Sequence, residues 1–323
     1  MPYFWPILLF LFGALFLYKG ASLLMANATA FARNLGIPVI AIGFTIVAFG
    51  TSLPELIVGI FAGIAGKSDI VLGNILGSNM ANIGIVLGLA ALINPINLPS
   101  KNNKFELLSF ILSGGILYLL ARDGALARLD GIILTALGIA FTIIAIKFHG
   151  EGKKFQETME RAVTIRHRRE MVLNILAILA GAALLFVGAR MLVVNAVSLA
   201  RMFRVSEILI GLTFVAIGTS LPEIVTAVIA SANKSNDLAI GNVLGSNILN
   251  ILMVLGLTLI ISPVVVSPAL WQYDLPILLF TTVIIAWLLR RGRRIGRING
   301  ILLLIGYFVY IAFSFFIRNN ASL

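Results

Sequence analysis

The chain has 323 residues, of which 60% are hydrophobic and only 11% are charged, and its net charge is +11. Soluble globular chains carry roughly 25% charged residues. This composition excludes a soluble fold, and the positive charge does not indicate nucleic-acid binding because it falls between apolar segments. The absence of cysteine excludes disulfides, thiolate metal sites and thiol redox chemistry.

Ten apolar segments follow one another along the chain, and each is long enough to cross a bilayer as a helix. The first segment lacks a basic leader and a small-residue cleavage site, so we interpret it as a retained span and not as a signal peptide. The predicted fold class is an all-α integral membrane protein with ten transmembrane helices. The predicted spans are residues 5–31, 37–64, 70–93, 105–121, 131–148, 171–199, 206–231, 238–261, 274–290 and 299–317.

The placement of lysine and arginine predicts the orientation of these spans. With ten spans most basic residues fall on one side, above all in the segments 147–169 and 290–297. Basic loops stay on the cytoplasmic side of a membrane. We therefore expect a multi-pass protein of the cell membrane with both termini extracellular and the lipid bilayer as its main partner.

One segment of the chain occurs twice. Residues 42–95 align without a gap with residues 210–263, and 27 of these 54 positions are identical. The offset contains five predicted spans, an odd number, so the second copy enters the membrane in the opposite direction. Such inverted repeats are typical of secondary transporters. The predicted organisation is a first five-helix repeat over 1–148, a cytoplasmic basic loop over 149–170 and a second, inverted five-helix repeat over 171–323.

Two acidic residues, Glu55 and Glu223, lie deep inside predicted spans and occupy equivalent positions in the two repeats. The other acidic residues, Glu106 and Asp274 among them, are expected in loops or at span ends. A bare carboxylate in hydrocarbon costs several kcal/mol, so it must be paired, protonated or bound to a cation. No basic residue is close to either glutamate in its own span. A cation ligand is favoured, and an ion pair with another span is the alternative.

The neighbours of Glu55 support a cation site. Thr51 and Ser52 precede it by four and three residues, so all three side chains are within reach of one another on a helix. Pro54 lacks an N–H and is expected to kink the span, which frees carbonyl groups around residues 48–50. Residues 216–223 repeat this arrangement.

The following span of each repeat adds further oxygen donors on one helix face. These are Ser78 with Asn82, and Ser246 with Asn250. Carboxylate, hydroxyl, amide and carbonyl oxygens are the ligands of hard cations such as Ca²⁺ and Na⁺, whereas Zn²⁺ and copper prefer histidine or cysteine. Two glutamates match the charge of one Ca²⁺. Mg²⁺ is a less favoured candidate than Ca²⁺ because it requires a tighter, octahedral set of ligands.

The two motif pairs resemble those of the cation/calcium antiporter superfamily, and the closest likeness is to prokaryotic sodium/calcium exchangers. The motifs are FGTSLPE at 49–55 with IGTSLPE at 217–223, and GNILGSN at 73–79 with GNVLGSN at 241–247. The resemblance implies an antiporter that moves Na⁺ and Ca²⁺ by alternating access, without enzymatic activity or a cofactor, and with a monomer sufficient for transport. It implies a calcium site of Thr51, Glu55, Thr219 and Glu223, sodium sites that add Ala48, Ser52, Ser78, Ala216, Ser220 and Ser246, and a centre lined by Asn82 and Asn250.

The sequence departs from the pattern of some family members at one position, which limits the ions that the resemblance implies. Some members carry aspartate at the position of Asn250, and its absence argues against potassium co-transport. The loop over 149–170 is too short for the calcium-sensing domains of animal exchangers. A calcium/proton antiporter or an exchanger of another divalent cation remains the nearest alternative, and a cation channel is a more distant one.

Overall fold

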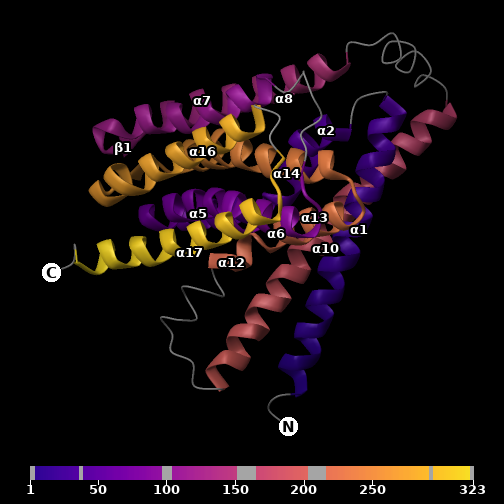
Figure 1. Cartoon of the computed structure of the whole chain (residues 1–323), viewed down its shortest axis with the longest axis horizontal. Coiled ribbons are helices and arrows are strands. Elements are labelled where there is room, and N and C mark those ends of the chain that lie inside the picture. The colour runs from indigo at the N-terminus through magenta and orange to yellow at the C-terminus, as the bar shows by residue number, and fades with distance from the viewer. Residues whose placement is uncertain are drawn as a thin grey trace.

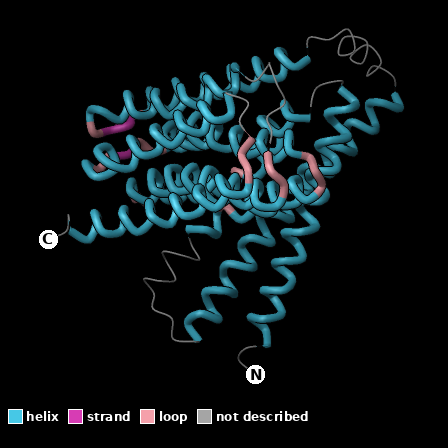
Figure 2. Tube along the Cα trace, in the orientation of Figure 1, coloured by secondary structure: helices cyan, strands magenta, loops and turns pink. Residues whose placement is uncertain are grey.

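The structure is a computed structural model, described here over residues 4–35, 39–96, 104–150, 165–202, 216–290 and 294–320. It is helical almost throughout (Figure 2). Within these ranges eight helices are long and apolar enough to cross a membrane, and nine if a pair bent at Ser52 is counted as one span. The predicted helical membrane protein is confirmed. The count of ten stays a prediction, because much of the span expected at 206–231 lies outside the described ranges.

The first half of the chain forms a series of helical elements and one short strand. They are α1 (Phe4–Leu35), α2 (Val39–Ile42), η1 (Gly43–Val47), α3 (Ala48–Thr51), α4 (Leu53–Ile64), α5 (Ser68–Ala81), η2 (Asn82–Val86), α6 (Leu87–Ile93), α7 (Lys104–Leu120), η3 (Ala121–Asp123), β1 (Ala125–Leu126) and α8 (Arg128–Gly150). The elements η1 and η2 are π-helical turns within otherwise α-helical segments.

The second half follows a similar order. Its elements are α10 (Ile165–Met202), α12 (Ala216–Thr219), α13 (Leu221–Ala232), α14 (Asn236–Leu249), η5 (Asn250–Leu255), α15 (Gly256–Ile261), β2 (Val264–Val265), η6 (Leu270–Asp274), α16 (Leu275–Arg290) and α17 (Arg297–Asn320). Helix α10 begins at Ile165, so it extends into the loop expected at 149–170.

Helix boundaries recur between the two halves at the spacing of the sequence repeat. Helices α4 and α13 have 12 residues each, and α5 and α14 have 14 each. Both 14-residue helices pass into a π-helical turn that begins with an asparagine, Asn82 or Asn250. The repeated sequence therefore produces a repeated local structure, down to the position at which each helix changes its hydrogen-bonding pattern.

The two long helices α1 and α10 lie side by side and project beyond the other helices (Figure 1). Glycines allow their backbones to approach closely. A Cβ atom on Gly20 would lie 2.7 Å from the Leu185 nitrogen, and one on Gly188 would lie 2.7 Å from the Leu17 nitrogen. Early residues of one helix meet late residues of the other, so the pair is antiparallel. Small residues of this kind permit close helix packing in membranes.

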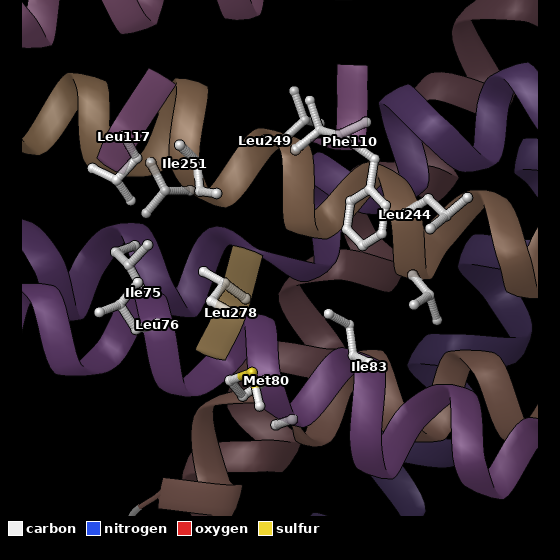
Figure 3. Close-up of a cluster of buried hydrophobic side chains, with 14 of the residues drawn as sticks. Ile75, Leu76, Met80, Ile83, Phe110, Leu117, Leu244, Leu249, Ile251 and Leu278 are labelled. Carbon is white, nitrogen blue, oxygen red and sulfur yellow. The ribbon is translucent and has the colours of Figure 1, made fainter. Parts of the chain in front are cut away.

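The core lies where α5, α7, α14 and α16 meet (Figure 3). Large side chains such as Ile75, Phe110 and Leu244 are fully buried there. The outer helices instead expose apolar side chains, including Leu129 on α8 and Ile298 and Leu302 on α17. Apolar residues thus occupy both the interior and the periphery, as expected for helices that are surrounded by lipid.

Two short backbone pairings, which were not predicted, connect loops at the helix ends. β1 pairs with β2 antiparallel, with Ala125 opposite Val265, and so joins the α7–α8 connection to the α15–α16 connection. Ile96 and Ile295 form a second antiparallel bridge. These contacts satisfy backbone groups that have no helical partner and hold neighbouring spans together at their ends.

Two acidic residues that were placed at span ends do lie at helix ends, and both are buried, which the sequence did not predict. Glu106 is completely buried in the first turn of α7, and Asp274 is 4% exposed just before α16. The Tyr310 hydroxyl donates to Asp274 at 2.8 Å, and Ser314 donates to it at 3.3 Å. A position at a helix end did not predict exposure, because a neighbouring helix, α17 in the case of Asp274, covers that end.

The α1–α10 contact predicts a contrast between two glycine substitutions. Gly20→Ala places a Cβ against the backbone of α10 and is expected to destabilise the fold by roughly 1–3 kcal/mol. Gly115→Ala in α7 is expected to be neutral or stabilising, because no described atom lies within 4 Å of its new Cβ. Thermal unfolding of the purified variants measures the difference, and equal melting temperatures would contradict the tight packing of α1 against α10.

Candidate cation-binding site

Each of the two motif helices breaks one turn before its glutamate. Ser52 lies between α3 and α4 with φ −83° and ψ 6°, and Ser220 has nearly the same conformation with φ −87° and ψ 6°. The first of these breaks bends the helix axis by 51°. A proline in the first turn lacks the N–H that would continue the preceding helix. The predicted kink is thus confirmed at Pro54.

The breaks place both glutamates in the first turn of a helix. Glu55 lies in the first turn of α4 and Glu223 in the first turn of α13. The exposed N–H groups and the helix dipole make this a favourable position for a carboxylate. A helix that ran unbroken through these motifs would leave the carboxylates beside backbone groups that are already paired.

Both carboxyl groups are completely buried and only partly hydrogen-bonded. The Ser78 hydroxyl donates to Glu55 Oε1 at 3.2 Å, and the Ser52 hydroxyl donates to Glu223 Oε1 at 3.3 Å. The second bond runs from the first repeat to the second. The Oε2 atoms of both glutamates have no hydrogen-bond partner among the described residues. Each carboxylate therefore keeps one oxygen available to a ligand.

Within the described ranges, neither glutamate forms an ion pair with a basic residue of another span. Lys19 and Arg190, the basic residues that lie within other spans, are both exposed. Glu55 and Glu223 are completely buried, away from the surface on which those side chains lie. Across the part of the chain that the structure describes, the two glutamates have hydroxyl and backbone neighbours but no cation of the protein.

Thr51 connects the first repeat to α14. Its hydroxyl donates to Asn242 Oδ1 at 3.2 Å and lies 3.4 Å from the Ser246 hydroxyl. Ser246 also donates to the Ala48 carbonyl at 3.4 Å, and the Ser52 N–H donates to the same carbonyl at 3.1 Å. The kink at Pro54 predicts that the Ala48 carbonyl has no hydrogen-bond donor. In this conformation it accepts hydrogen bonds from both of these groups.

The predicted central asparagines are completely buried and differ in their bonding. The Asn250 amide donates to Asn79 Oδ1 at 3.1 Å, and the Asn79 amide donates to the Asn247 carbonyl at 3.2 Å. Asn82 has no partner for either its oxygen or its nitrogen within the described ranges. A buried polar group without a partner costs about 1–3 kcal/mol, so Asn82 is suited to bind a polar species in the interior.

The remaining predicted site residues are placed in part. Ser220 is completely buried and its hydroxyl has no partner among the residues described. Thr219 ends α12 and is partly buried. Ala216 begins the same short helix, and its side chain lies outside the described part of the structure. The geometry thus brings Ser52 and Ser78 directly onto the carboxylates, whereas the contacts of Thr219 and Ala216 stay predictions.

One polar residue of this region was missed by sequence reasoning. Thr226 is completely buried on α13, and its hydroxyl has no partner within the described ranges. It follows Glu223 by three residues and therefore lies on nearly the same face of the helix. That spacing was the available signal. It was overlooked because the equivalent position in the first repeat is Val58.

A glycine of α14 allows another helix to approach the site. A Cβ atom on Gly245 would lie 2.5 Å from the Phe44 carbonyl oxygen and 2.8 Å from the Ala48 Cβ. Helix backbones therefore pack closely at this glycine. Its counterpart in α5 is Gly77, where an added Cβ would meet no atom of another described segment within 4 Å. The counterpart of Phe44 is Leu212, which lies outside the described ranges.

The oxygen atoms that could bind a cation at this site are mostly neutral, and few of them belong to charged groups. No cluster of three or more histidine, cysteine, aspartate or glutamate side chains occurs in the described ranges. The site instead combines two carboxylates with hydroxyl, amide and carbonyl groups from both halves of the chain. Such ligands suit hard cations of modest charge, above all Ca²⁺ and Na⁺.

Comparisons with known proteins agree with this site. A family profile described as sodium/calcium exchanger protein matches residues 5–147 and 173–316. The chain is 37% identical over 317 residues to inner membrane protein YrbG of Escherichia coli, covering 96% of each. It is 29% identical over 344 residues to sodium/calcium exchanger MaX1 of Methanosarcina acetivorans, covering 96% of this chain and 98% of MaX1.

A solved structure shows the same fold. The sodium-calcium exchanger NCX_Mj superposes with a TM-score of 0.83 at 28% identity, over 95% of this chain and 98% of that one. The protein belongs to the sodium/calcium exchanger family, since the family profile covers most of both halves. It is a cation/calcium antiporter of the multi-pass membrane type.

The unpartnered amide of Asn82 predicts an unusual stability effect. Asn82→Leu removes a buried polar group that has no hydrogen bond within the described ranges, so the ion-free protein is expected to become more stable, by about 1 kcal/mol or more. Stabilisation by added Ca²⁺ or Na⁺ is expected to weaken, because ligand binding stabilises the folded state. Thermal unfolding with and without each ion measures both effects.

Asn79→Leu is the matched control for this variant. Asn79 makes two side-chain hydrogen bonds, so its replacement is expected to lower the stability of the ion-free protein. If both leucine variants lose stability equally in the absence of ions, Asn82 has a structural role instead of a ligand role.

Proposed function

We propose that this protein exchanges Na⁺ for Ca²⁺ across the cell membrane by alternating access. The observation that carries the proposal is the pair of completely buried glutamates, Glu55 and Glu223, each with one unpartnered carboxylate oxygen and no basic partner in the described structure. The hydroxyl groups of Ser52 and Ser78, both from the first repeat, donate to them. Relatives named as sodium/calcium exchangers support the choice of ions.

The proposed calcium site consists of Thr51, Glu55, Thr219 and Glu223. The flanking sodium sites add oxygens of Ala48, Ser52, Ser78, Ala216, Ser220 and Ser246, and Asn82 and Asn250 line the centre. One observation supports the inclusion of Ser52 and Ser78. Ser52 and Ser78 already donate to the glutamates, and a bound cation would turn these hydroxyl oxygens toward itself as acceptors. Ca²⁺ and Na⁺ are similar in size, so they compete for the same carboxylates.

Charge burial explains why such a site exchanges ions and does not leak them. When both glutamates are ionised and the site is empty, two negative charges lie in the same low-dielectric interior, since Ser52, three residues before Glu55, donates to Glu223. The conformational change would have to carry this uncompensated charge. A bound Ca²⁺ or sodium ions remove the penalty, so the protein changes conformation readily only when it is loaded.

The architecture proposed for this movement is two inverted repeats of five helices, over 1–148 and 171–323, with ten spans and both termini extracellular. The recurring boundaries of α4, α5, α13 and α14 support a repeat, and the antiparallel packing of α1 on α10 supports its inversion. Helix α1 also contacts α13, and α10 contacts α3. A displacement of the α1–α10 pair would therefore reach α13, which carries Glu223, and α3, which precedes the break before Glu55.

Neutralising either glutamate is expected to abolish calcium transport. Glu55→Gln or Glu223→Gln keeps the shape of the side chain but removes the charge that balances Ca²⁺. Uptake of calcium-45 into proteoliposomes, driven by sodium trapped inside, measures the loss, which we expect to be at least a hundredfold. Asp123→Asn is the control, because Asp123 is exposed and lies in the α7–α8 connection. Wild-type uptake by either glutamine variant would refute the site.

The coupling ion follows from the gradient that drives uptake. In the same proteoliposomes, an outward sodium gradient is expected to drive calcium uptake, whereas matched potassium or proton gradients are not. Uptake driven by protons alone would identify a calcium/proton antiporter. Calcium flux that does not depend on any ion on the opposite side would identify a channel.

A further inference from the structure

A cavity of about 390 Å³ lies between α7 and α16, on the outside of the ion-binding helices. One face of each helix lines it, at a spacing of three or four residues along the chain. The lining residues are Lys104, Leu107, Leu108 and Ile111 of α7, and Val283, Ala286, Trp287 and Arg290 of α16. The two helices are antiparallel, so the start of α7 faces the end of α16.

This arrangement places both charges of the cavity at one end. Lys104 opens α7 and Arg290 closes α16, and both side chains are exposed. Neither forms a salt bridge with a described residue. Glu106, the nearest acidic residue in the sequence, is completely buried and does not line the cavity. Among the described residues nothing balances the charge of this basic end, so it attracts an anion.

The rest of the cavity is apolar and is long enough for part of a lipid chain. From Lys104 to Ile111 the groove follows about 10 Å of helix at 1.5 Å per residue. One leaflet of the hydrocarbon core is about 15 Å deep. Leu108 and Val283 are partly open to the outside, at 54% and 41% exposure, so the groove opens toward the bilayer. Trp287, one turn from Arg290, suits the membrane interface.

We propose that this groove is a binding site for an anionic phospholipid. The phosphate lies between Lys104 and Arg290, and one acyl chain lies along Leu107, Leu108 and Ile111. Basic pockets between transmembrane helices bind acidic head groups in this manner. The basic loop that follows Arg290 assigns this end to the cytoplasmic side, so the lipid belongs to the inner leaflet.

A lipid in this position bridges the two halves of the protein. Helix α7 contacts α14 and η5, whereas α16 contacts α5 and η2. An occupant that contacts both α7 and α16 therefore connects the helix packed on η5, which begins at Asn250, with the helix packed on η2, which begins at Asn82. Bound lipid is expected to raise the melting temperature of the protein, because it binds the folded state only.

Native mass spectrometry of the full chain in detergent tests the site without any transport assay. Phosphatidylglycerol and phosphatidylcholine with the same acyl chains are titrated separately. The wild type is expected to bind phosphatidylglycerol more tightly. The double variant Lys104→Gln, Arg290→Gln is expected to bind it roughly thirtyfold more weakly, since each basic residue contributes about 1 kcal/mol to the attraction.

Two further variants separate charge from shape. Arg122→Gln with Arg128→Gln removes two exposed charges near the opposite end of α7 and is expected to leave phosphatidylglycerol affinity within twofold. Leu108→Trp fills the groove from its open side and is expected to weaken the binding of both lipids while all charges remain.

Three results would overturn the proposal. The first is unchanged phosphatidylglycerol affinity in the Lys104 and Arg290 double variant. The second is equal binding of the two lipids by the wild type. The third is full displacement of phosphatidylglycerol by equimolar glycerol 3-phosphate, which would identify a site for a free phosphate compound. Because Lys104 and Arg290 are exposed, their replacement is not expected to prevent folding.

Discussion

The burial of two carboxylates away from water is the constraint on which the rest of the structure depends. Glu55 and Glu223 are completely buried, and their neighbours Ser52 and Ser78 supply only neutral hydrogen bonds. Such charges are tolerated in a membrane interior only when they are compensated. In the proposed function the interior surrounding them admits a cation from outside, which is the property a transporter requires. A fold that paired them with its own lysine or arginine would be more stable without ions and useless for exchange.

The broken helices follow from the same constraint. A continuous helix satisfies its own backbone and offers nothing to an ion. The turn at Ser52 ends one helix and begins another, so a helix N-terminus lies under the glutamate, and the second repeat does the same at Ser220. Meanwhile Gly245 lets the backbone of η1 and α3 approach α14 until oxygens of both repeats meet. The irregular backbone segments are thus concentrated around Glu55 and Glu223.

The periphery has different demands. Helices α1 and α10 contact each other through glycines and cross the elements around the two central glutamates, whereas α7 and α16 support these elements from the other side. Glu106 on α7 and Asp274 just before α16 show that this side of the molecule also buries carboxyl groups. The Tyr310 and Ser314 hydroxyls satisfy Asp274, so that carboxylate holds α17 against η6. Two kinds of buried carboxylate therefore coexist: the central pair retains an open oxygen, whereas Asp274 is held by hydroxyl donors.

The sequence by itself determined the membrane class, the repeat, the kink at Pro54 and the central pair of glutamates, because each of these depends on composition or on spacing along one helix. It did not determine which side chains meet across helices. Several features depend on how distant helices pack. They are the bond from Ser52 to Glu223, the contact of Thr51 with Asn242, the unpartnered state of Asn82 within the described ranges, and the burial of Glu106 and Asp274. Only the tertiary structure decides these contacts. A helix that is apolar on every side carries no sequence pattern that indicates which of its faces points inward.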